Sequence, residues 1–465
     1  MLQLIIIAVY FLAVIGIGLA GRRRHLRFDE YMTAGRKYST PFITGSLLAT
    51  IIGGSATIGL AGLAFSRGLT GAWWLLVGSL GLIVLGFFFA AKVRNFGFYT
   101  LPQIIEKHYG AKVSLSSSIV IVLAWTGVTA AQIIAAGKIL SVLGIGSSEV
   151  WMVVFTLIFL GYAFTGGQYS IIRTDILDIV LIFAGIFCGL GVLLYKVGGL
   201  GQLFSVMPVD KLSFPVSSSF GVMDLLAYLL VVGLTYVVGP DLYGRLFCAR
   251  DGSTARKAAF WAAVLIVPLA FAISLIGMGA SLLFPGISSE QAFPQLITGL
   301  LPSLVGGLVM AALVSAIMST AVATLWSSST ILSINVIGFF TKPQDDRRSL
   351  LFSRLSILII GLASLGLALV LKGVISTIVF AYTIYTCGVI VPAIAGFYQH
   401  KLKVTPNAAL ASIIGGGAVG LISKLLSIKY LDVGAIGISL ALLLIISLVE
   451  NRLHYSRNKP VNPVL

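Results

Sequence analysis

The stretch PFITGSLLATIIGGSATIGLAGLA, residues 41–64, is long and apolar enough to cross a membrane, yet small residues interrupt its centre. The interruption consists of Gly53, Gly54 and Ser55. Unwound backbone at membrane depth exposes N–H and C=O groups that hydrocarbon cannot satisfy, so it occurs only where protein or a polar cavity surrounds it. We therefore expect a broken membrane helix here, with a binding site beside the break.

The composition is that of a polytopic helical membrane protein. Hydrophobic residues make up 58% of the 465 positions and charged residues only 10%. The longest stretch between apolar runs, about 196–223, is too short to form a soluble domain. Residues 2–21 lack a basic start and a small-residue cleavage site, so we interpret them as a retained span rather than a signal peptide.

The net charge is +16, and the basic residues are distributed unequally between the two predicted membrane sides. This distribution argues against a nucleic-acid partner. If the N-terminus is outside, 24 of the 31 Lys and Arg residues fall in inner segments and six in outer ones. The first inner loop alone holds Arg22, Arg23, Arg24 and Arg27. This asymmetry predicts an inner (plasma) membrane protein with its N-terminus outside and its C-terminus cytoplasmic.

Apolar runs of about 20 residues predict thirteen transmembrane helices. Spans two to eleven form two groups of five that enter the membrane from opposite sides, which is an inverted repeat. We divide the chain into 1–39 (extra helix and loop), 40–200 (repeat 1), 201–403 (repeat 2) and 404–465 (two further helices and a tail). The first span of repeat 2 is also interrupted, at Gly239 and Pro240. Matched breaks in inverted halves indicate a transporter site near the midplane, although packing glycines and simple kinks are the alternative.

Five segments carry a resemblance to a known family. They are FDEYMTAGRKYS (28–39), SLLATIIGGSATIGLAG (46–62), GGQYSIIRTDILDIV (166–180), GPDLYGRLFCARDGSTARKA (239–258) and SAIMSTAVATLWSSSTILSINVI (315–337). Over nearly its whole length the chain resembles the sodium:solute symporter family. The resemblance implies an all-α, leucine-transporter-type fold of five plus five helices, with one extra helix before them and two after.

The resemblance also implies a sodium site between the first broken span and the eighth span of the repeats. Its ligands would be the carbonyls of Ala49, Ile52 and Ala316 with the hydroxyls of Ser319 and Thr320. Independently, positions 316, 319 and 320 lie on one helical face, and neutral oxygens suit a hard cation. The alternative is that these hydroxyls bond back to their own helix.

We expect a single sodium ion, because the positions of the family's second site hold Val322 and Ala323, although Asp175 is retained. Asp175 and Asp178 lie near Arg173, so either a local ion pair or an inner-gate contact is possible.

Asp241 precedes Arg245 by one helical turn, which favours a gate latch and a functional intramembrane acid equally.

The solute is expected beside the two breaks. Hydroxyl groups and the N–H groups of a new half-helix favour a carboxylate there. The candidate solute-binding residues are Thr50, Gly53, Gly54, Ser55, Thr57, Gln132, Tyr236 and Thr383. For each facing-span residue a plain helix–helix contact is the alternative. Departures from the sugar symporters disfavour a sugar, and Ile51 stands where proline symporters carry an acid, which leaves no partner for an ammonium group at that position.

These features predict a sodium-coupled symporter that imports a small organic solute, preferably a monocarboxylate or an amino acid. A proton-coupled symporter and a sodium/sugar symporter on the same fold are the alternatives. An enzyme is not expected, because the spans hold no converging His, Asp, Glu and Cys residues, and three cysteines without ligand spacing suggest no zinc site. The identity of the solute and the oligomeric state stay open.

Overall fold

The computed structural model describes residues 2–21, 28–341, 345–371 and 373–457, and their regular structure is helical. Ten helices in these ranges are long and apolar enough to cross a membrane. Three shorter apolar helices accompany them, at Leu2–Ile17, Thr40–Ile51 and Ser148–Phe164. The predicted all-α membrane fold is confirmed, and the number of thirteen crossings stays a prediction. Arg22, Arg23, Arg24 and Arg27 lie outside the described residues.

Twelve helices make up most of the bundle in the described ranges. Their bounds are α1 Leu2–Gly21, α3 Thr40–Ile51, α4 Leu60–Arg67, α5 Trp73–Val84, α8 Ala111–Ser141, α9 Ser148–Val197, α15 Gly252–Leu283, α17 Ser303–Ile331, α19 Asp346–Val370, α20 Val374–Tyr385, α23 Pro406–Leu425 and α24 Leu431–Arg457. Within α9, Gly167 has φ 60° and ψ 179°, a conformation that divides the element into two spans, as the apolar runs at about 150–166 and 170–197 predict.

Both predicted interruptions are present. Helix α3 ends at Ile51, and a π-helical turn, η3 (Ser55–Gly59), begins after three non-helical residues and leads into α4. In the second case α13 (Leu234–Val237) ends, Val238 and Gly239 leave the helical conformation, and α14 (Pro240–Leu246) begins with its proline. Proline suits that first position, because its missing N–H has no partner there in any helix.

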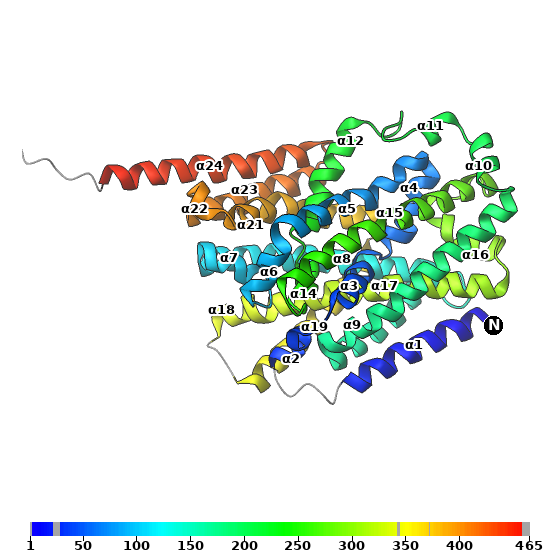
Figure 1. The fold of residues 1–465 in the computed structure, drawn as a ribbon, viewed down its shortest axis with the longest axis horizontal. Coiled ribbons are helices and arrows are strands. Elements are labelled where there is room, and N and C mark those ends of the chain that lie inside the picture. The colour runs from blue at the N-terminus through cyan, green and yellow to red at the C-terminus, as the bar shows by residue number, and fades with distance from the viewer. Residues whose placement is uncertain (1, 22–27, 342–344, 372, 458–465) are drawn as a thin grey trace, which may run out of the picture.

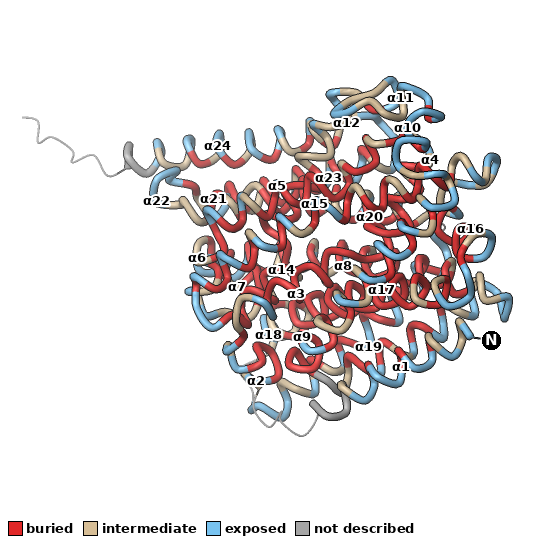
Figure 2. The backbone as a smooth tube through the Cα atoms, turned by 45° about the vertical axis from the view of Figure 1, so that its right-hand side comes forward, coloured by how far each residue is buried: buried red, intermediate tan, exposed pale blue. Residues whose placement is uncertain are grey.

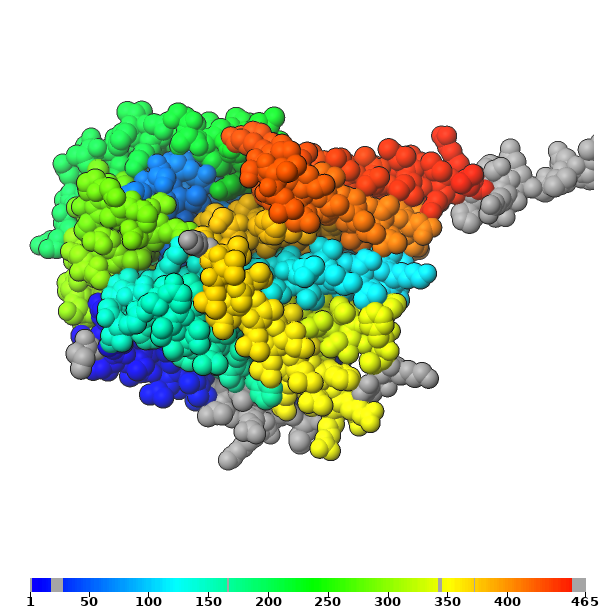
Figure 3. Space-filling view, turned by 180° about the vertical axis from the view of Figure 1, so that it is seen from behind, coloured from blue at the N-terminus to red at the C-terminus, as the bar shows by residue number. Residues whose placement is uncertain are grey.

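Helix α17 forms the centre of the molecule. Nearly all its residues from Gly306 to Ile331 are buried, and it packs against α1, α3, α8, α9 and α19. The backbone is buried throughout the interior and exposed along the outer helices (Figure 2). From behind, α19 lies across α8 and α9 (Figure 3). A polar site on α17 is therefore enclosed by other helices.

The two ends of the bundle carry different elements. Figure 1 shows the N-terminus with α10 (Leu200–Val206) and α16 (Ala292–Gly299) at one end. At the opposite end lie α7 (Leu101–Tyr109), α18 (Gly338–Phe340) and α22 (Gln399–Leu402). The broken helices α3 and α14 lie between these ends, beside α17.

Candidate functional site

At the break after α3, the N–H groups of Gly53 and Gly54 do not form the usual helical hydrogen bonds. In a continuous helix the N–H groups of residues 53 and 54 would bond to the carbonyls of Ala49 and Thr50. Instead the Gly53 N–H donates to the Ile51 carbonyl (3.0 Å), and the Gly54 N–H donates to the side-chain oxygen of Gln132 on α8 (2.7 Å). The carbonyls of Ala49 and Thr50 are thereby left for partners from another helix.

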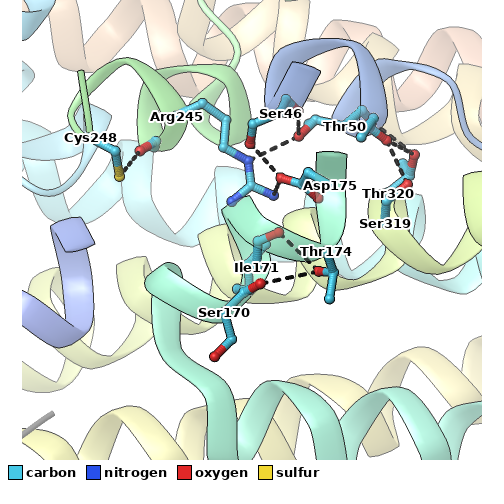
Figure 4. Close-up of polar contacts among 12 residues, drawn as sticks. Ser46, Thr50, Ser170, Ile171, Thr174, Asp175, Arg245, Cys248, Ser319 and Thr320 are labelled. Carbon is cyan, nitrogen blue, oxygen red and sulfur yellow. Dashed lines mark hydrogen bonds and ion pairs between the residues drawn. The ribbon is translucent and has the colours of Figure 1, made fainter. Parts of the chain in front are cut away.

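Those partners are two hydroxyls of α17. The Ser319 hydroxyl donates to the carbonyls of Ala49 (2.8 Å) and Ala316 (3.1 Å). The Thr320 hydroxyl lies within hydrogen-bond distance of the carbonyls of Ala49 (3.2 Å) and Thr50 (3.0 Å). Figure 4 shows Ser319 and Thr320 beside the broken end of α3. We call these three carbonyls and two hydroxyls the oxygen cluster.

The oxygen cluster contains four of the five predicted sodium ligands, those on Ala49, Ala316, Ser319 and Thr320. Among the described residues, the Thr320 hydroxyl reaches the Thr50 carbonyl, and neither hydroxyl reaches that of Ile52. Thr50 was predicted to contribute its hydroxyl to the solute, so its carbonyl is an addition to the set. An uncharged all-oxygen cluster suits a hard monovalent cation. No group of His, Cys, Asp and Glu residues in the described ranges could hold a transition metal.

Close approach explains both glycines of the break. A Cβ on Gly53 would lie 2.6 Å from the Thr320 hydroxyl oxygen and 2.7 Å from the Gln132 side-chain oxygen. A Cβ on Gly54 would lie 2.3 Å from the Ala135 Cβ. Any larger residue would push α3 away from α8 or α17. Gly53 and Gly54 thus act through their backbone.

The second break is closed by tyrosines. The Val237 carbonyl accepts from the hydroxyl of Tyr243 (3.2 Å), and the Val238 carbonyl accepts from the hydroxyl of Tyr385 on α20. The Leu242 N–H, which would reach back to Val238 in a continuous helix, donates to the Asp241 carboxylate (3.0 Å). The carbonyls of Val237 and Val238 are therefore already satisfied by bulky side chains.

A buried ion pair joins the second broken helix to two helices of the first half. The Arg245 guanidinium lies 3.5 Å from the Asp175 carboxylate of α9, and its Nε donates to the Thr50 hydroxyl (3.0 Å). The Ser46 hydroxyl donates to the same carboxylate. Figure 4 shows the Arg245 guanidinium directed at Asp175 and Thr50. Arg245 is 1% exposed and Asp175 0%.

This arrangement changes the predicted pairing of the acids. Arg245 pairs with Asp175, not with Asp241, and Arg173 lies over the Tyr169 ring (4.3 Å) rather than beside an acid. Asp178 accepts from the hydroxyl of Tyr10 on α1 (2.9 Å), away from the breaks. Of the four predicted gating residues, the structure brings Asp175 and Arg245 together.

A narrow central cavity lies between the two breaks. It is lined by Thr50, Ile51, Ser55, Val128, Gln132, Thr235, Tyr236, Asp241, Leu242, Thr320, Thr324, Ile378 and Tyr382. The predicted solute residues Thr50, Ser55, Gln132 and Tyr236 are among them, next to Thr320 of the oxygen cluster. A second cavity, the inner cavity, continues from Asp241 and Arg245 towards Tyr99 and Thr100.

Two predicted solute residues point elsewhere. The Thr57 hydroxyl donates to the Gly53 carbonyl (2.9 Å), and the Thr383 hydroxyl donates to the Val379 carbonyl (2.8 Å). Tyr382, one position before Thr383, lines the cavity instead, one turn from Ile378. Ile378 and Tyr382 are spaced i, i+4, which places both on the side of α20 that faces the cavity. The prediction of Thr383 missed this face because it looked for a small polar residue.

Comparison with known proteins shows the family of this chain. A model of the sodium:solute symporter family matches residues 31–416. The chain belongs to the sodium:solute symporter family. It is a multi-pass membrane protein of a family of transporters, and the expectation from its motifs is confirmed.

Similar members of this family differ in their named solutes. The sodium/glucose cotransporter 2 of Rattus norvegicus is 25% identical over 90% of this chain and 71% of its own. The high-affinity proline transporter PutP of Bacillus subtilis is 24% identical over 76% of this chain and 77% of its own.

Two solved structures show the same fold. A Na⁺-coupled sialic acid symporter, described in a substrate-bound outward-open state, superposes with a TM-score of 0.83 over 97% of this chain and 98% of its own, at 16% identity. MhsT in complex with L-phenylalanine superposes with a TM-score of 0.57 over 89% of this chain and 98% of its own, at 14% identity.

Proposed function

We propose that this protein is a sodium-coupled importer of a small organic solute that carries a carboxylate. The oxygen cluster is the observation that carries the proposal. Two hydroxyls of α17 meet helix-end carbonyls of α3 without any charged ligand, and the cluster shares Thr50 and Thr320 with the central cavity. Ion and solute would thus bind in contact, so that each stabilises the other.

A carboxylate is preferred because of the helix that begins at Ser55. Ser55 lines the central cavity at the start of η3, where the positive end of the helix dipole faces a bound anion. A sodium ion at the oxygen cluster would add to that attraction. Within the proposal, Ser55 and Gln132 orient the carboxylate, and Tyr236 packs against the rest of the solute.

One sodium ion per cycle is the proposed stoichiometry. Asp175, the acid that remains from a possible second site, already faces the Arg245 guanidinium and the Ser46 hydroxyl. For a solute without net charge, one sodium ion crossing about 100 mV provides roughly 2.3 kcal/mol, whereas with a monocarboxylate anion the two charges cancel. A tenfold sodium gradient adds about 1.4 kcal/mol to the electrical contribution. For the solute without net charge, their sum could sustain a solute gradient of about a few hundredfold.

Alternating access would move one bundle of helices relative to the other around the paired breaks of the two repeats, 40–200 and 201–403. The ion pair of Arg245 and Asp175 joins the repeats and borders the inner cavity, which supports a role as the inner gate. The charge asymmetry of the loops supports an N-terminus outside and a cytoplasmic C-terminus.

Reconstitution into proteoliposomes tests the coupling ion. A thermal-shift panel of small carboxylates, amino acids and sugars, each with sodium or choline chloride, first finds a solute that stabilises the protein. Uptake of that solute should follow an imposed sodium gradient and ignore a pH gradient. Uptake driven by the pH gradient without sodium would instead establish a proton-coupled symporter.

A sodium/sugar symporter is the second candidate, favoured by the similarity to a glucose cotransporter. Stabilisation by sugars alone, in a sodium-dependent manner, would select it over the carboxylate importer.

A further inference from the structure

Asp241 is an acid in the central cavity that has no basic side chain within ion-pair distance in the described ranges. It is the one charged residue among those that line the central cavity, and it also lines the inner cavity. Its side chain is partly exposed to this space. One carboxylate oxygen accepts from the Leu242 N–H at 3.0 Å. In the described ranges Asp241 forms no ion pair.

The neighbouring arginine does not cancel this charge. Arg245 is the other charged residue of the inner cavity, and its guanidinium is directed to Asp175, 3.5 Å away. These three residues together carry one net negative charge. An unpaired charge in a membrane interior costs several kcal/mol, so a cation that visits the cavity would be attracted to Asp241.

The surroundings of Asp241 suit an organic cation better than a metal ion. Tyr236 and Tyr382 line the same cavity, and the Trp125 ring lies 6.2 Å from that of Tyr382. Val128 and Ile378 complete an apolar wall. Aromatic faces attract ammonium groups, whereas sodium prefers several oxygen ligands, which the oxygen cluster offers.

The cavity therefore has two poles. Ser55 marks the positive end, at the start of η3, and Asp241 marks the negative end, at the start of α14. We propose that Asp241 binds a cationic nitrogen of the solute, so that the transported molecule is a small zwitterion with one carboxylate and one ammonium group. This inference rests on the proposed sodium-coupled import and narrows its solute class. The second break supplies the ammonium partner that Ile51 does not.

Pairs of molecules that differ only at the nitrogen test this inference. Alanine is compared with lactate, proline with tetrahydrofuroate, and glycine betaine with tert-butylacetate. Binding to the full-length protein is measured by thermal shift and calorimetry in sodium and in choline. In at least one pair, the nitrogen-bearing member should bind about thirtyfold or more tightly than its partner, as expected for a buried charge pair. The pair that responds distinguishes an α-amino acid from a quaternary amine.

Asp241→Asn removes the charge while its amide oxygen can still accept from the Leu242 N–H. This variant should lose the preference for the nitrogen-bearing member but keep the stabilisation by sodium alone. Asp241→Glu, which keeps the charge, should retain the preference at lower affinity. Asp210→Asn is the matched control, because Asp210 also accepts from a backbone N–H, that of Ser218 (2.8 Å), in a segment outside both cavities.

Several results would overturn the inference. They are equal or tighter binding of the nitrogen-free members, binding of none of the six molecules, an unchanged preference in Asp241→Asn, or loss of sodium stabilisation in that variant. Absence of sodium stabilisation in the wild-type protein is a different result, which would refute the proposed sodium coupling itself.

Discussion

The two broken helices end in different ways, although small residues interrupt both. At the first break, the small hydroxyl groups of Ser319 and Thr320 contact the free carbonyls of Ala49 and Thr50. At the second, the phenol groups of Tyr243 and Tyr385 occupy the carbonyls of Val237 and Val238. A serine or threonine hydroxyl can rotate its proton away and offer a lone pair to a cation, and its small size leaves room for one. The first break is therefore suited to an ion, and the second contributes charged side chains.

The largest expected effect is loss of the ion site at the first break. In the double variant Ser319→Ala and Thr320→Ala, the carbonyls of α3 lose both hydroxyls that complete the oxygen cluster. We expect sodium-dependent uptake to fall to the level of protein-free liposomes, and the stabilisation by sodium over choline to disappear. Ser329→Ala is the control, because that hydroxyl bonds to the carbonyls of Leu325 (2.7 Å) and Trp326 (3.1 Å) on its own helix. Wild-type sodium dependence in the double variant would contradict the assignment.

A somewhat smaller effect is expected at the second break. Arg245→Ala leaves the buried Asp175 carboxylate without its cation, at a cost of about 3–5 kcal/mol in unfolding free energy. Arg250→Ala removes an exposed partner of Asp251 (3.3 Å) and should cost about 1 kcal/mol or less. Unfolding in detergent, followed by circular dichroism, compares the two.

A double variant separates the charge from the packing. When Arg245→Gln is combined with Asp175→Asn, neither member of the pair is charged, so part of the stability lost in Arg245→Ala should return. Equal losses for Arg245→Ala and Arg250→Ala would show that the buried pair is not a structural link between the breaks.

The smallest effect is expected from Gly53→Ala. The new methyl group would lie 2.6 Å from the Thr320 hydroxyl oxygen, so α3 and α17 would have to separate. Overpacking of this kind costs about 1–3 kcal/mol, and we expect it as weaker sodium binding in a calorimetric titration. Gly366→Ala on α19 is the control, because nothing lies within 4 Å of its Cβ position. Sodium affinity equal to that of the control would mean that the break tolerates a side chain.

Local sequence signals predicted the breaks themselves. Gly53 and Gly54 within an apolar run, and Gly239 before Pro240, each weaken a helix through properties of the residues alone. The face shared by Ala316, Ser319 and Thr320 likewise follows from helical spacing, and the family resemblance indicated its function.

Local sequence signals did not predict the contacts between segments that are distant in the chain. Gln132 captures the Gly54 N–H, and so frees the Thr50 carbonyl, only because α8 passes beside the break. The pairing of Arg245 with Asp175 joins residues 70 positions apart in the chain, whereas sequence spacing offered Asp241, one turn away, as one possible partner. The acid that pairs with an arginine depends on how the helices pack, and local spacing in one sequence does not determine this packing.

The bond between Tyr10 and Asp178 bears on the role of the first helix. Both side chains are buried, and α1 lies against α9 and α17. Without residues 2–21, the Asp178 carboxylate would face the bilayer with no donor from α1, a penalty of about 1–3 kcal/mol or more for a charged group. Helix α1, which precedes the repeats, is thus part of the folded core. A protein that lacks it would expose the Asp178 carboxylate on its surface.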